Sequence, residues 1–220
     1  MSGARLRRGL YAISQEQDDT AALLDWAAAV IAGGAACIQY RDKSENPARR
    51  RRQAGALAAL CTASAVPFIV NDDVDLAADC GADGVHLGEH DGDPRRARAR
   101  LGGTALIGVS CYNDLARARQ LAGAGADYLA FGAFFDSRSK PAARRASPAI
   151  LASARALGLP LVAIGGITPD NGGDLVRAGA DLLAVIGGLS GAPEQAADTA
   201  RRYAALFAAH PLPSSTDRSS

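Results

Sequence analysis

The stretch Arg177-Ala178-Gly179-Ala180-Asp181-Leu182 (RAGADL) decides the fold, because variants of it recur along the chain. The other copies are AGGAAC at Ala32–Cys37, CGADG at Cys80–Gly84 and GAGADY at Gly123–Tyr128. Each copy follows a helical pattern rich in alanine or leucine and precedes a short apolar run. A glycine just past a helix supplies the left-handed residue that closes it, and the apolar run is typical of a strand buried on both faces. The phrase therefore predicts where a helix ends and a parallel strand begins.

The distance between copies predicts two strand–helix units per copy. Counted from Gly33, Gly81, Gly125 and Gly179, the copies lie 44 to 54 residues apart, and one unit with its loops takes roughly 25–30 residues. Eight strands are expected, near Leu10–Ile13, Cys37–Arg41, Phe68–Val70, Gly84–His86, Leu106–Val109, Tyr128–Phe131, Leu161–Ile164 and Leu182–Ile186. The helices expected between them include Thr20–Ile31, Pro47–Thr62, Asp114–Leu121, Ser147–Leu157, Pro169–Arg177 and Pro193–Ala208.

Two of these helices carry a start signal, in which a cap residue precedes proline at the first helical position: Ser147 with Pro148, and Thr168 with Pro169. Eight parallel strands alternating with helices favour a single (β/α)8 TIM barrel, with an open doubly wound sheet as the alternative. A chain of 220 residues leaves little room for a second domain. We expect the barrel to span residues 1–209 and the Ser- and Pro-rich stretch 210–220 to be a disordered tail.

The composition bounds the class of protein. The formal net charge is +1, so no field of the whole protein favours nucleic acid or an anionic membrane. No apolar run approaches the roughly 20 residues of a membrane-spanning helix, and the basic start lacks the apolar stretch of a signal peptide. The four cysteines are scattered without metal spacing, which is typical of reduced packing residues in a cytoplasmic protein. The sequence leaves the oligomeric state open, a homo-oligomer included.

Functional residues of such barrels follow the carboxyl ends of the strands. After the second expected strand comes Gln39-Tyr40-Arg41-Asp42-Lys43. In an extended chain Gln39, Arg41 and Lys43 point the same way, which gathers the donors that a phosphate or diphosphate requires. The alternative is a polar strand end in which Arg41 pairs with Asp42.

Carboxylates follow the third and fourth expected strands. Asp72 and Asp91 should lie at neighbouring strand ends, and two carboxylates with substrate and water oxygens are what Mg²⁺ prefers. The alternative is that acidic residues here, such as Asp73 and Asp75, only cap the next helix. His86 ends the fourth strand and is either a functional group or a satisfied core residue; His90 is more typical of an exposed loop.

The remaining strand ends add weaker signals. Ser110 follows the fifth strand, and a long loop from Gly132 to Lys140, with hydroxyls and cations, follows the sixth and fits either a lid or a solvated surface loop. Paired glycines at Gly165-Gly166 and Gly187-Gly188 follow strands seven and eight, where barrels commonly bind phosphate on backbone amides. The alternative is that these glycines serve only tight turns.

Taken together, these stretches resemble the thiamine-phosphate synthase family, also called thiamine-phosphate pyrophosphorylases, over about Leu10–Phe207. The matching stretches are QYRDK at Gln39–Lys43, NDDVDLA at Asn71–Ala77, GADGVHLGEHD at Gly81–Asp91, IGVS at Ile107–Ser110, SRSK at Ser137–Lys140 and AIGGITPDN at Ala163–Asn171. The resemblance implies a transferase of thiamine biosynthesis that couples an aminopyrimidine diphosphate to a thiazole phosphate, small-molecule substrates both, with Mg²⁺ as cofactor.

The resemblance also implies residue roles. Asp72 and Asp91 fall on the Mg²⁺ ligands; Arg41, Lys43, Asn71, Ser110 and Lys140 on diphosphate contacts; Gln39 and His86 on positions facing the aminopyrimidine; Ser137 and Ser139 on hydroxyls near the thiazole; and Gly166, Gly187 and Gly188 on the thiazole phosphate site. The chain departs from the family pattern in Ser137 and Ser139 for threonine, Asp136 for proline, Glu89 for glutamine and Gly187 for serine.

Two other functions compete with this interpretation. A paralogous, thiazole tautomerase-like barrel would isomerise the thiazole phosphate, but such relatives tend to lose the diphosphate and metal side chains that this chain has. A non-catalytic phosphate-binding barrel would need only the glycine turns. The absence of a convincing Ser/His/Asp or Cys/His triad fits a reaction driven by substrate placement and by stabilisation of the leaving diphosphate.

Overall fold

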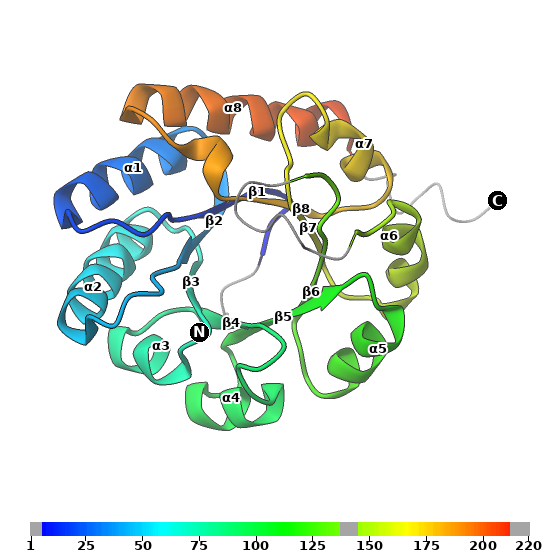
Figure 1. The fold of residues 1–220 in the computed structure, drawn as a ribbon, viewed down its shortest axis with the longest axis horizontal. Coiled ribbons are helices and arrows are strands. Elements are labelled where there is room, and N and C mark those ends of the chain that lie inside the picture. Colours follow the sequence, from blue (N-terminus) through cyan, green and yellow to red (C-terminus); the bar gives the residue numbers. More distant parts are fainter. Residues whose placement is uncertain (1–5, 137–144, 212–220) are drawn as a thin grey trace.

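Eight parallel strands pair in sequence order and close on themselves, as the last strand pairs with the first (Figure 1). The computed structural model describes residues 6–136 and 145–211. The strands are β1 (Gly9–Ile13), β2 (Ala35–Tyr40), β3 (Phe68–Asn71), β4 (Gly84–Leu87), β5 (Leu106–Tyr112), β6 (Tyr128–Phe131), β7 (Leu161–Ile164) and β8 (Leu182–Val185). All eight strands lie where the sequence predicts them. The single (β/α)8 barrel is confirmed, and the open sheet is wrong.

Helices form a ring around the strands (Figure 1). They are α1 (Thr20–Ala32), α2 (Pro47–Ala63), α3 (Val74–Cys80), α4 (Pro94–Leu101), α5 (Leu115–Gly123), α6 (Ala149–Ala154), α7 (Gly172–Arg177) and α8 (Pro193–Ala209), with short 3₁₀ helices η1 (Arg155–Leu157) and η2 (Gly187–Leu189). No helix in the described ranges is long and apolar enough to cross a membrane. Most of the expected tail, residues 212–220, lies outside the described residues.

Alternation along the strands divides the core in two. One set of buried side chains packs between the strands and the helices, as Leu10 and Ala12 of β1 do. The other set fills the inside of the barrel and includes Tyr11, Ile13, Cys37, Ile69, Leu106, Tyr128, Val162 and Leu182. The barrel interior is therefore a packed core, and a ligand can bind only at one of its ends.

The recurring phrase has the predicted geometry at its glycines. Gly34, Gly81, Gly125 and Gly179 all have positive φ, between 69° and 112°. In the first copy the left-handed residue is Gly34, one position later than the Gly33 used for counting. Gly33 has a φ of −78° and serves another purpose, because a Cβ there would stand 2.5 Å from the Cβ of Ala200 in α8.

The aspartates of the phrase join neighbouring strands at the amino end of the barrel. Asp83, Asp127 and Asp181 immediately precede β4, β6 and β8. Their carboxylates accept the backbone N–H of Phe68 at 2.8 Å, of Ile107 at 2.6 Å and of Leu161 at 3.0 Å, at the starts of β3, β5 and β7. Each carboxylate therefore satisfies an amide that has no partner in a strand ladder and helps to hold two strands in register.

One predicted helix start is wrong, and another is displaced by one residue. The Thr168-Pro169 signal opens a turn, and α7 begins only at Gly172, because Thr168 and Asn171 exchange hydrogen bonds: Thr168 N donates to Asn171 Oδ1 at 2.8 Å and Asn171 N to Thr168 Oγ1 at 3.3 Å. At the other site α6 begins at Ala149, one residue after Pro148, and ends at Ala154, where the tighter η1 follows.

Replacement of Asp181 by alanine tests the role of the repeated aspartate. The variant leaves the buried Leu161 N–H without its acceptor and Arg155 without its ion-pair partner at 3.2 Å. We expect the free energy of unfolding, measured by urea denaturation, to fall by about 1–3 kcal/mol. The control is Asp79→Ala, which removes an exposed carboxylate 3.8 Å from Arg100 and should change stability by less than about 0.5 kcal/mol. Equal losses in the two variants would contradict the role.

Candidate active site

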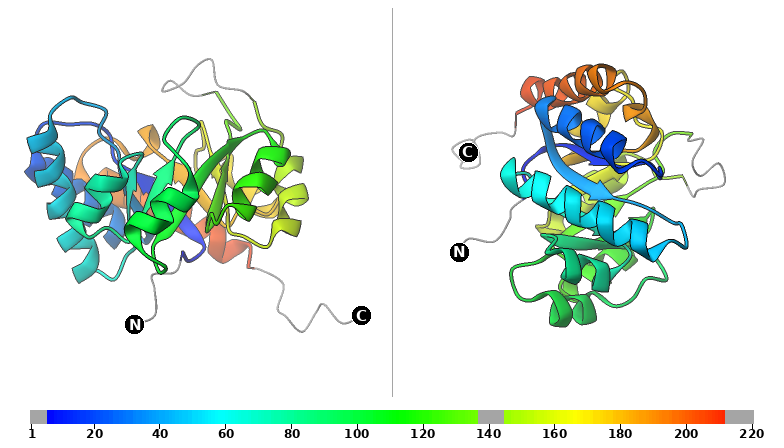
Figure 2. Two further views of the ribbon diagram at one scale, coloured as in Figure 1. Left: turned by 90° about the horizontal axis from the view of Figure 1, so that it is seen from below. Right: turned by 90° about the vertical axis from the view of Figure 1, so that its left-hand side faces the viewer.

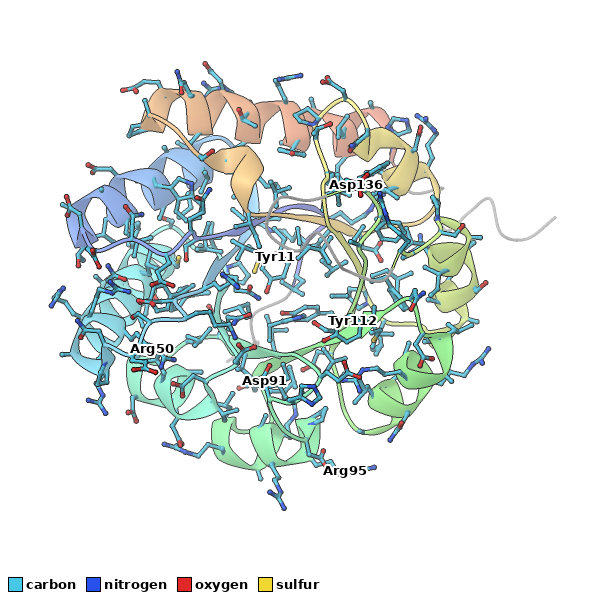
Figure 3. All side chains as sticks on the ribbon, in the orientation of Figure 1. Tyr11, Arg50, Asp91, Arg95, Tyr112 and Asp136 are labelled. Carbon is cyan, nitrogen blue, oxygen red and sulfur yellow. The ribbon has the colours of Figure 1, made fainter. Side chains whose placement is uncertain are left out.

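A cleft of about 370 Å³ opens where the strands end. Figure 2 shows the barrel from two further sides, and in Figure 3 the labelled Asp91 and Tyr112 lie on the side of the barrel formed by β4 and β5. The predicted residues that line the cleft are Arg41, Lys43, Asn71, Asp72, His86, Asp91 and Ser110, and Gly88, Glu89, His90 and Tyr112 complete the lining. Residues of four consecutive strand ends thus converge on one space, as the sequence predicts.

The cationic wall of the cleft comes from the segment after β2. Arg41 and Lys43 both line the cleft, and the backbone N–H of Arg41 donates to Ser14 Oγ at 2.9 Å. The Lys43 ammonium pairs with Asp72. Asp42, between the two cations, turns away from the cleft and binds Arg49. The alternative in which Arg41 is neutralised by Asp42 is therefore wrong, and both cations face the cleft.

The acidic wall consists of Asp72 and Asp91. Asp72 has a left-handed backbone, with φ of 64°, and accepts Asn71 Nδ2 at 2.7 Å. Asp91 accepts the backbone N–H of Gly88 at 2.9 Å. A Cβ on Gly88 would stand 2.5 Å from Asp91 Oδ2 and 4.0 Å from Asp72 Oδ1, so the glycine leaves open the space that both carboxylates border. Asp72 is thus placed by its backbone to face the second carboxylate.

Burial and the closeness of Asp91 raise the pKa of Asp72, while Lys43 opposes this rise. A site in which one carboxylate disfavours the ionisation of another is one that a cation stabilises. Within residues 6–136 and 145–211, no cluster of three or more His, Cys, Asp or Glu side chains is arranged to hold a metal. A divalent ion here would consequently need oxygens from a substrate or from water in addition to the two carboxylates.

A chain of hydrogen bonds, here called the floor, lies at the base of the cleft. Of its members, His86 and Ser110 line the cleft, whereas the predicted Gln39 and the tyrosines Tyr11 and Tyr128 are buried behind them. Gln39 Nε2 donates to Tyr11 Oη at 2.9 Å, and Tyr11 Oη lies 2.8 Å from Tyr128 Oη. His86 bridges Tyr128 Oη, 3.2 Å from its Nδ1, and Ser110 Oγ, 3.0 Å from its Nε2. Burial raises the pKa of both tyrosines well above the usual value, so they remain neutral. The two tyrosines therefore add no charge beneath the charged walls.

The two floor tyrosines were missed by sequence reasoning. Tyr11 and Tyr128 are 1% and 0% exposed inside otherwise apolar strands, so nothing local distinguishes them from packing residues. One indirect signal exists, because Gly108 in the IGVS motif faces the Tyr128 ring, and a Cβ on Gly108 would overlap that ring. A glycine within a buried strand thus marks the large side chain that lies across from it.

Tyr112 is a third cleft residue that the sequence did not indicate. The register between β5 and β6 shifts between Ser110 and Tyr112, and Tyr112 has a φ of 56°, which is uncommon for a bulky side chain. Arg117 supports this segment from α5: its Nε donates to the carbonyl of Ser110 at 2.9 Å, and its guanidinium lies 6.0 Å from the centre of the Tyr112 ring. The irregularity places Ser110 and Tyr112 both on the cleft.

The predicted glycine turns lie together beside the cleft but outside its lining. Gly166 has φ of 63° and has no room for a Cβ, which would overlap the carbonyl of Asp136. A Cβ on Gly188 would stand 3.8 Å from the carbonyl of Ile167, next to Gly166, so the two turns are neighbours. At Gly187 nothing lies within 4 Å of an added Cβ. Packing therefore explains why residue 166 is a glycine, whereas a larger side chain would fit at position 187.

Three predicted site residues, Ser137, Ser139 and Lys140, lie outside the described residues. At the edge of that segment, Asp136 pairs with Arg145, whose Nη1 donates to the carbonyl of Phe134 at 3.2 Å. Asp73 has the alternative role considered for it: it caps α3 through Leu76 N at 2.9 Å and pairs with Arg50 at 2.8 Å. Of the acidic residues after β3, Asp72 therefore lines the cleft, whereas Asp73 stabilises the fold.

Comparison with known proteins identifies the family. The model of the thiamine monophosphate synthase family matches residues 10–189. A thiamine-phosphate synthase of Methylobacillus flagellatus is 54% identical over 200 residues, which are 91% of this chain and 95% of that protein. Its counterpart in Chromobacterium violaceum is 54% identical over 201 residues, 91% of this chain and 97% of that protein. The solved thiamine phosphate pyrophosphorylase of Pyrococcus furiosus superposes with a TM-score of 0.83 at 28% identity, covering 94% of this chain and 98% of that one.

Replacement of Gly108 by alanine tests the packing of the floor. Because the new methyl group overlaps the Tyr128 ring, we expect the free energy of unfolding to fall by about 1–3 kcal/mol. The matched control is Gly55→Ala on the exposed face of α2, where nothing lies within 4 Å of the new Cβ and a gain of roughly 0.5–1 kcal/mol is expected. Unchanged stability in Gly108→Ala, measured by thermal unfolding, would show that the tyrosine moves aside freely.

Proposed function

The chain belongs to the thiamine monophosphate synthase family, and we propose that it joins 4-amino-5-hydroxymethyl-2-methylpyrimidine diphosphate to hydroxyethylthiazole phosphate, giving thiamine phosphate and diphosphate. One observation supports this most strongly: Arg41 and Lys43 share a single cleft with Asp72 and Asp91, and the hydrogen-bonded polar floor lies beneath them. A substrate with a diphosphate at one end and a neutral polar ring at the other matches that division of charge.

The diphosphate would bind the charged walls. Arg41 and Lys43 supply charge-assisted donors, and Asn71 and Ser110 add neutral ones at the ends of β3 and β5. Lys140, from the segment after β6, is assigned here as well on the family resemblance. These groups also act in the reaction, because negative charge builds up on the leaving diphosphate as the bond to carbon breaks.

Mg²⁺ is the proposed cofactor, held by Asp72 and Asp91. The donor set fits: two carboxylates border one open space at Gly88, and hard oxygen ligands completed by phosphate and water are typical of this ion. When bound, the ion would offset the charge of the diphosphate and of the two carboxylates. Lys43 pairs with Asp72, and this pairing keeps the second cation of the segment directed into the cleft.

The aminopyrimidine ring would lie on the floor. Gln39 and His86 are fixed by the tyrosines between them, at 2.9 Å and 3.2 Å, and their hydrogen-bonding groups can therefore be positioned without rearrangement. Gly166, Gly187 and Gly188 would hold the phosphate of the thiazole substrate on backbone amides. Ser137 and Ser139 would lie near the thiazole ring on the family resemblance.

In the reaction, the lone pair of the thiazole nitrogen forms a bond to the methylene carbon of the pyrimidine. The bond from that carbon to the diphosphate oxygen breaks, and its electron pair leaves with the diphosphate. The nucleophile is a neutral ring nitrogen without a proton, so no general base is needed. The electron-rich aminopyrimidine can stabilise positive charge at the methylene, which permits a dissociative path. The protein contributes placement and stabilisation of the leaving charge.

Replacement of Asp72 by asparagine tests the acidic wall. Asparagine tolerates a left-handed backbone, so the variant removes the charge while it keeps the fold. We expect turnover to fall on the order of 10²-fold or more. The control is Asp73→Asn, where the new residue remains a good helix cap outside the cleft and turnover should stay within about twofold. Turnover near that of the wild type in purified Asp72→Asn would refute the assignment.

Dependence on Mg²⁺ tests the cofactor proposal. Exhaustive chelation should abolish formation of thiamine phosphate, and added Mg²⁺ should restore it. Calorimetric titration of Mg²⁺ in the presence of inorganic diphosphate gives a readout apart from turnover: Asp91→Asn should bind Mg²⁺ about 10-fold or more weakly, whereas Asp93→Asn, which only caps α4, should bind it as the wild type does. Full activity after chelation contradicts the proposal.

One assay separates the coupling reaction from the competing functions. The purified protein is mixed with both substrates and Mg²⁺, and thiamine phosphate and diphosphate are measured together. Equal amounts of the two products are expected. A paralogue that isomerises the thiazole phosphate, or a barrel that only binds phosphate, would release no diphosphate.

A further inference from the structure

We propose that Asp42 and Arg49 form a positioning pair that holds Arg41 and Lys43 in the cleft. The inference rests on the proposed function, in which those two cations bind the diphosphate. The pair itself lies outside the cleft lining, and the family resemblance, although its QYRDK stretch contains Asp42, assigns no role to either residue. Its role follows from where it is anchored.

The direction of Asp42 sets the direction of its neighbours. Arg41 and Lys43 line the cleft, while the Asp42 side chain between them is only 1% exposed and lies against α2. Because adjacent side chains of an extended segment point to opposite sides, a fixed Asp42 directs both neighbours toward the cleft. In the motif Arg41-Asp42-Lys43, the two outer residues thus line the cleft and the middle one fixes the segment to α2.

Asp42 is held by a bidentate ion pair with Arg49. Arg49 Nε donates to Asp42 Oδ2 and Arg49 Nη2 to Asp42 Oδ1, both at 3.0 Å. The backbone N–H of Ser44 donates to Asp42 Oδ1 at 2.7 Å, and Tyr40 Oη to Asp42 Oδ2 at 3.1 Å. Burial acts against ionisation of Asp42, but the hydrogen bonds from Arg49, Ser44 and Tyr40 outweigh it and lower its pKa to about 2. The pair therefore stays charged at every pH used for an assay.

Arg49 also binds the loop between β1 and α1. Its Nη2 lies 3.3 Å from Glu16 Oε1, and its Nη1 pairs with Asp18. Glu16 in turn accepts the backbone N–H of Lys43 at 3.2 Å. One guanidinium consequently joins two neighbouring loops, and one of its partners holds the backbone of a cleft cation directly.

The first turns of α2 hold the pair in place. Asn46 caps the helix by accepting the N–H of Arg49 at 3.0 Å. One turn further, Gln53 Oε1 lies 2.9 Å from Tyr40 Oη and shares that hydroxyl hydrogen with Asp42, while Gln53 Nε2 donates to the carbonyl of Gln17 at 3.0 Å. Tyr40, Asp42, Arg49 and Gln53 at the centre of the network are buried and hydrogen-bonded to one another, which is the arrangement that fixes a single geometry.

The experiment is to disrupt the pair with Asp42→Asn and Arg49→Gln in the full-length protein. The matched control is Asp127→Asn, which disrupts a comparable arginine pair, Arg98 to Asp127 at 2.5 Å, at the opposite end of the barrel. Steady-state kinetics are measured for each substrate separately, and affinity for inorganic diphosphate with Mg²⁺ is measured by calorimetry.

We expect the KM for the pyrimidine diphosphate and the Kd for inorganic diphosphate to rise roughly 10–100-fold in both variants, as when groups that orient metal ligands are lost. The KM for the thiazole phosphate should stay within about twofold. Arg49→Lys retains the positive charge but not the bidentate geometry. Its KM for the pyrimidine diphosphate and its Kd for inorganic diphosphate should therefore lie between those of Arg49→Gln and the wild type. Asp127→Asn should lower the melting temperature without raising either KM.

Unchanged diphosphate affinity in Asp42→Asn and Arg49→Gln would overturn the inference, and so would equal increases in both KM values. If Asp42→Asn does not fold, the two Arg49 variants still decide the question. A wild-type protein that binds diphosphate but forms no thiamine phosphate would refute the proposed function alone, because the calorimetric comparison still tests the pair. A wild type that binds no diphosphate would refute both.

Discussion

Closure of a parallel sheet brings the carboxyl ends of all eight strands to one rim, and every feature of the candidate site depends on that constraint. Residues as distant in sequence as Gln39, His86 and Ser110 are joined by hydrogen bonds only because β2, β4 and β5 end at the same level. The closure is supported from the opposite end, where Asp83, Asp127 and Asp181 each bind the start of the preceding strand. The barrel thus separates stability at one end from chemistry at the other.

Charge at the rim is arranged in opposing walls. Cations follow β2 and carboxylates follow β3 and β4, and Lys43 pairs with Asp72 across the boundary. Burial and the neighbouring Asp91 raise the pKa of Asp72, and Lys43 opposes this rise. Outside the cleft lining, the buried ion pair of Asp42 with Arg49 presents little charge to solvent. The cleft therefore keeps its charges available because a second layer of residues holds them.

The sequence predicts the fold more completely than the site. Glycine after a helix marks the starts of β2, β4, β6 and β8, and short apolar runs mark the strands between them, since both are local signals. The helix start at Pro169 is wrong because a cap residue before proline also suits a turn, and the exchange between Thr168 and Asn171 could not be foreseen from either residue.

Within the site, charged residues at strand ends are predictable, because a charge next to a buried strand is costly unless it binds a partner or a ligand. Tyr11 and Tyr128 are not predictable in this way, since a tyrosine in an apolar strand is indistinguishable from a core residue. Only the closure of the barrel brings their two hydroxyl oxygens within 2.8 Å of each other. The same holds for Tyr112, whose orientation depends on a register shift between β5 and β6. Side chains placed by tertiary packing leave no mark in their immediate sequence.

The filled interior of the barrel has a consequence for the traffic of reactants. Because Tyr11, Leu106, Tyr128 and their neighbours close the central axis, nothing can pass through the barrel from end to end. A molecule resting on the hydrogen-bonded floor must leave by the opening through which it entered. On the proposed reaction, the substrate that lies deeper must arrive before the shallower one, and the joined product and the diphosphate must both leave by that same opening.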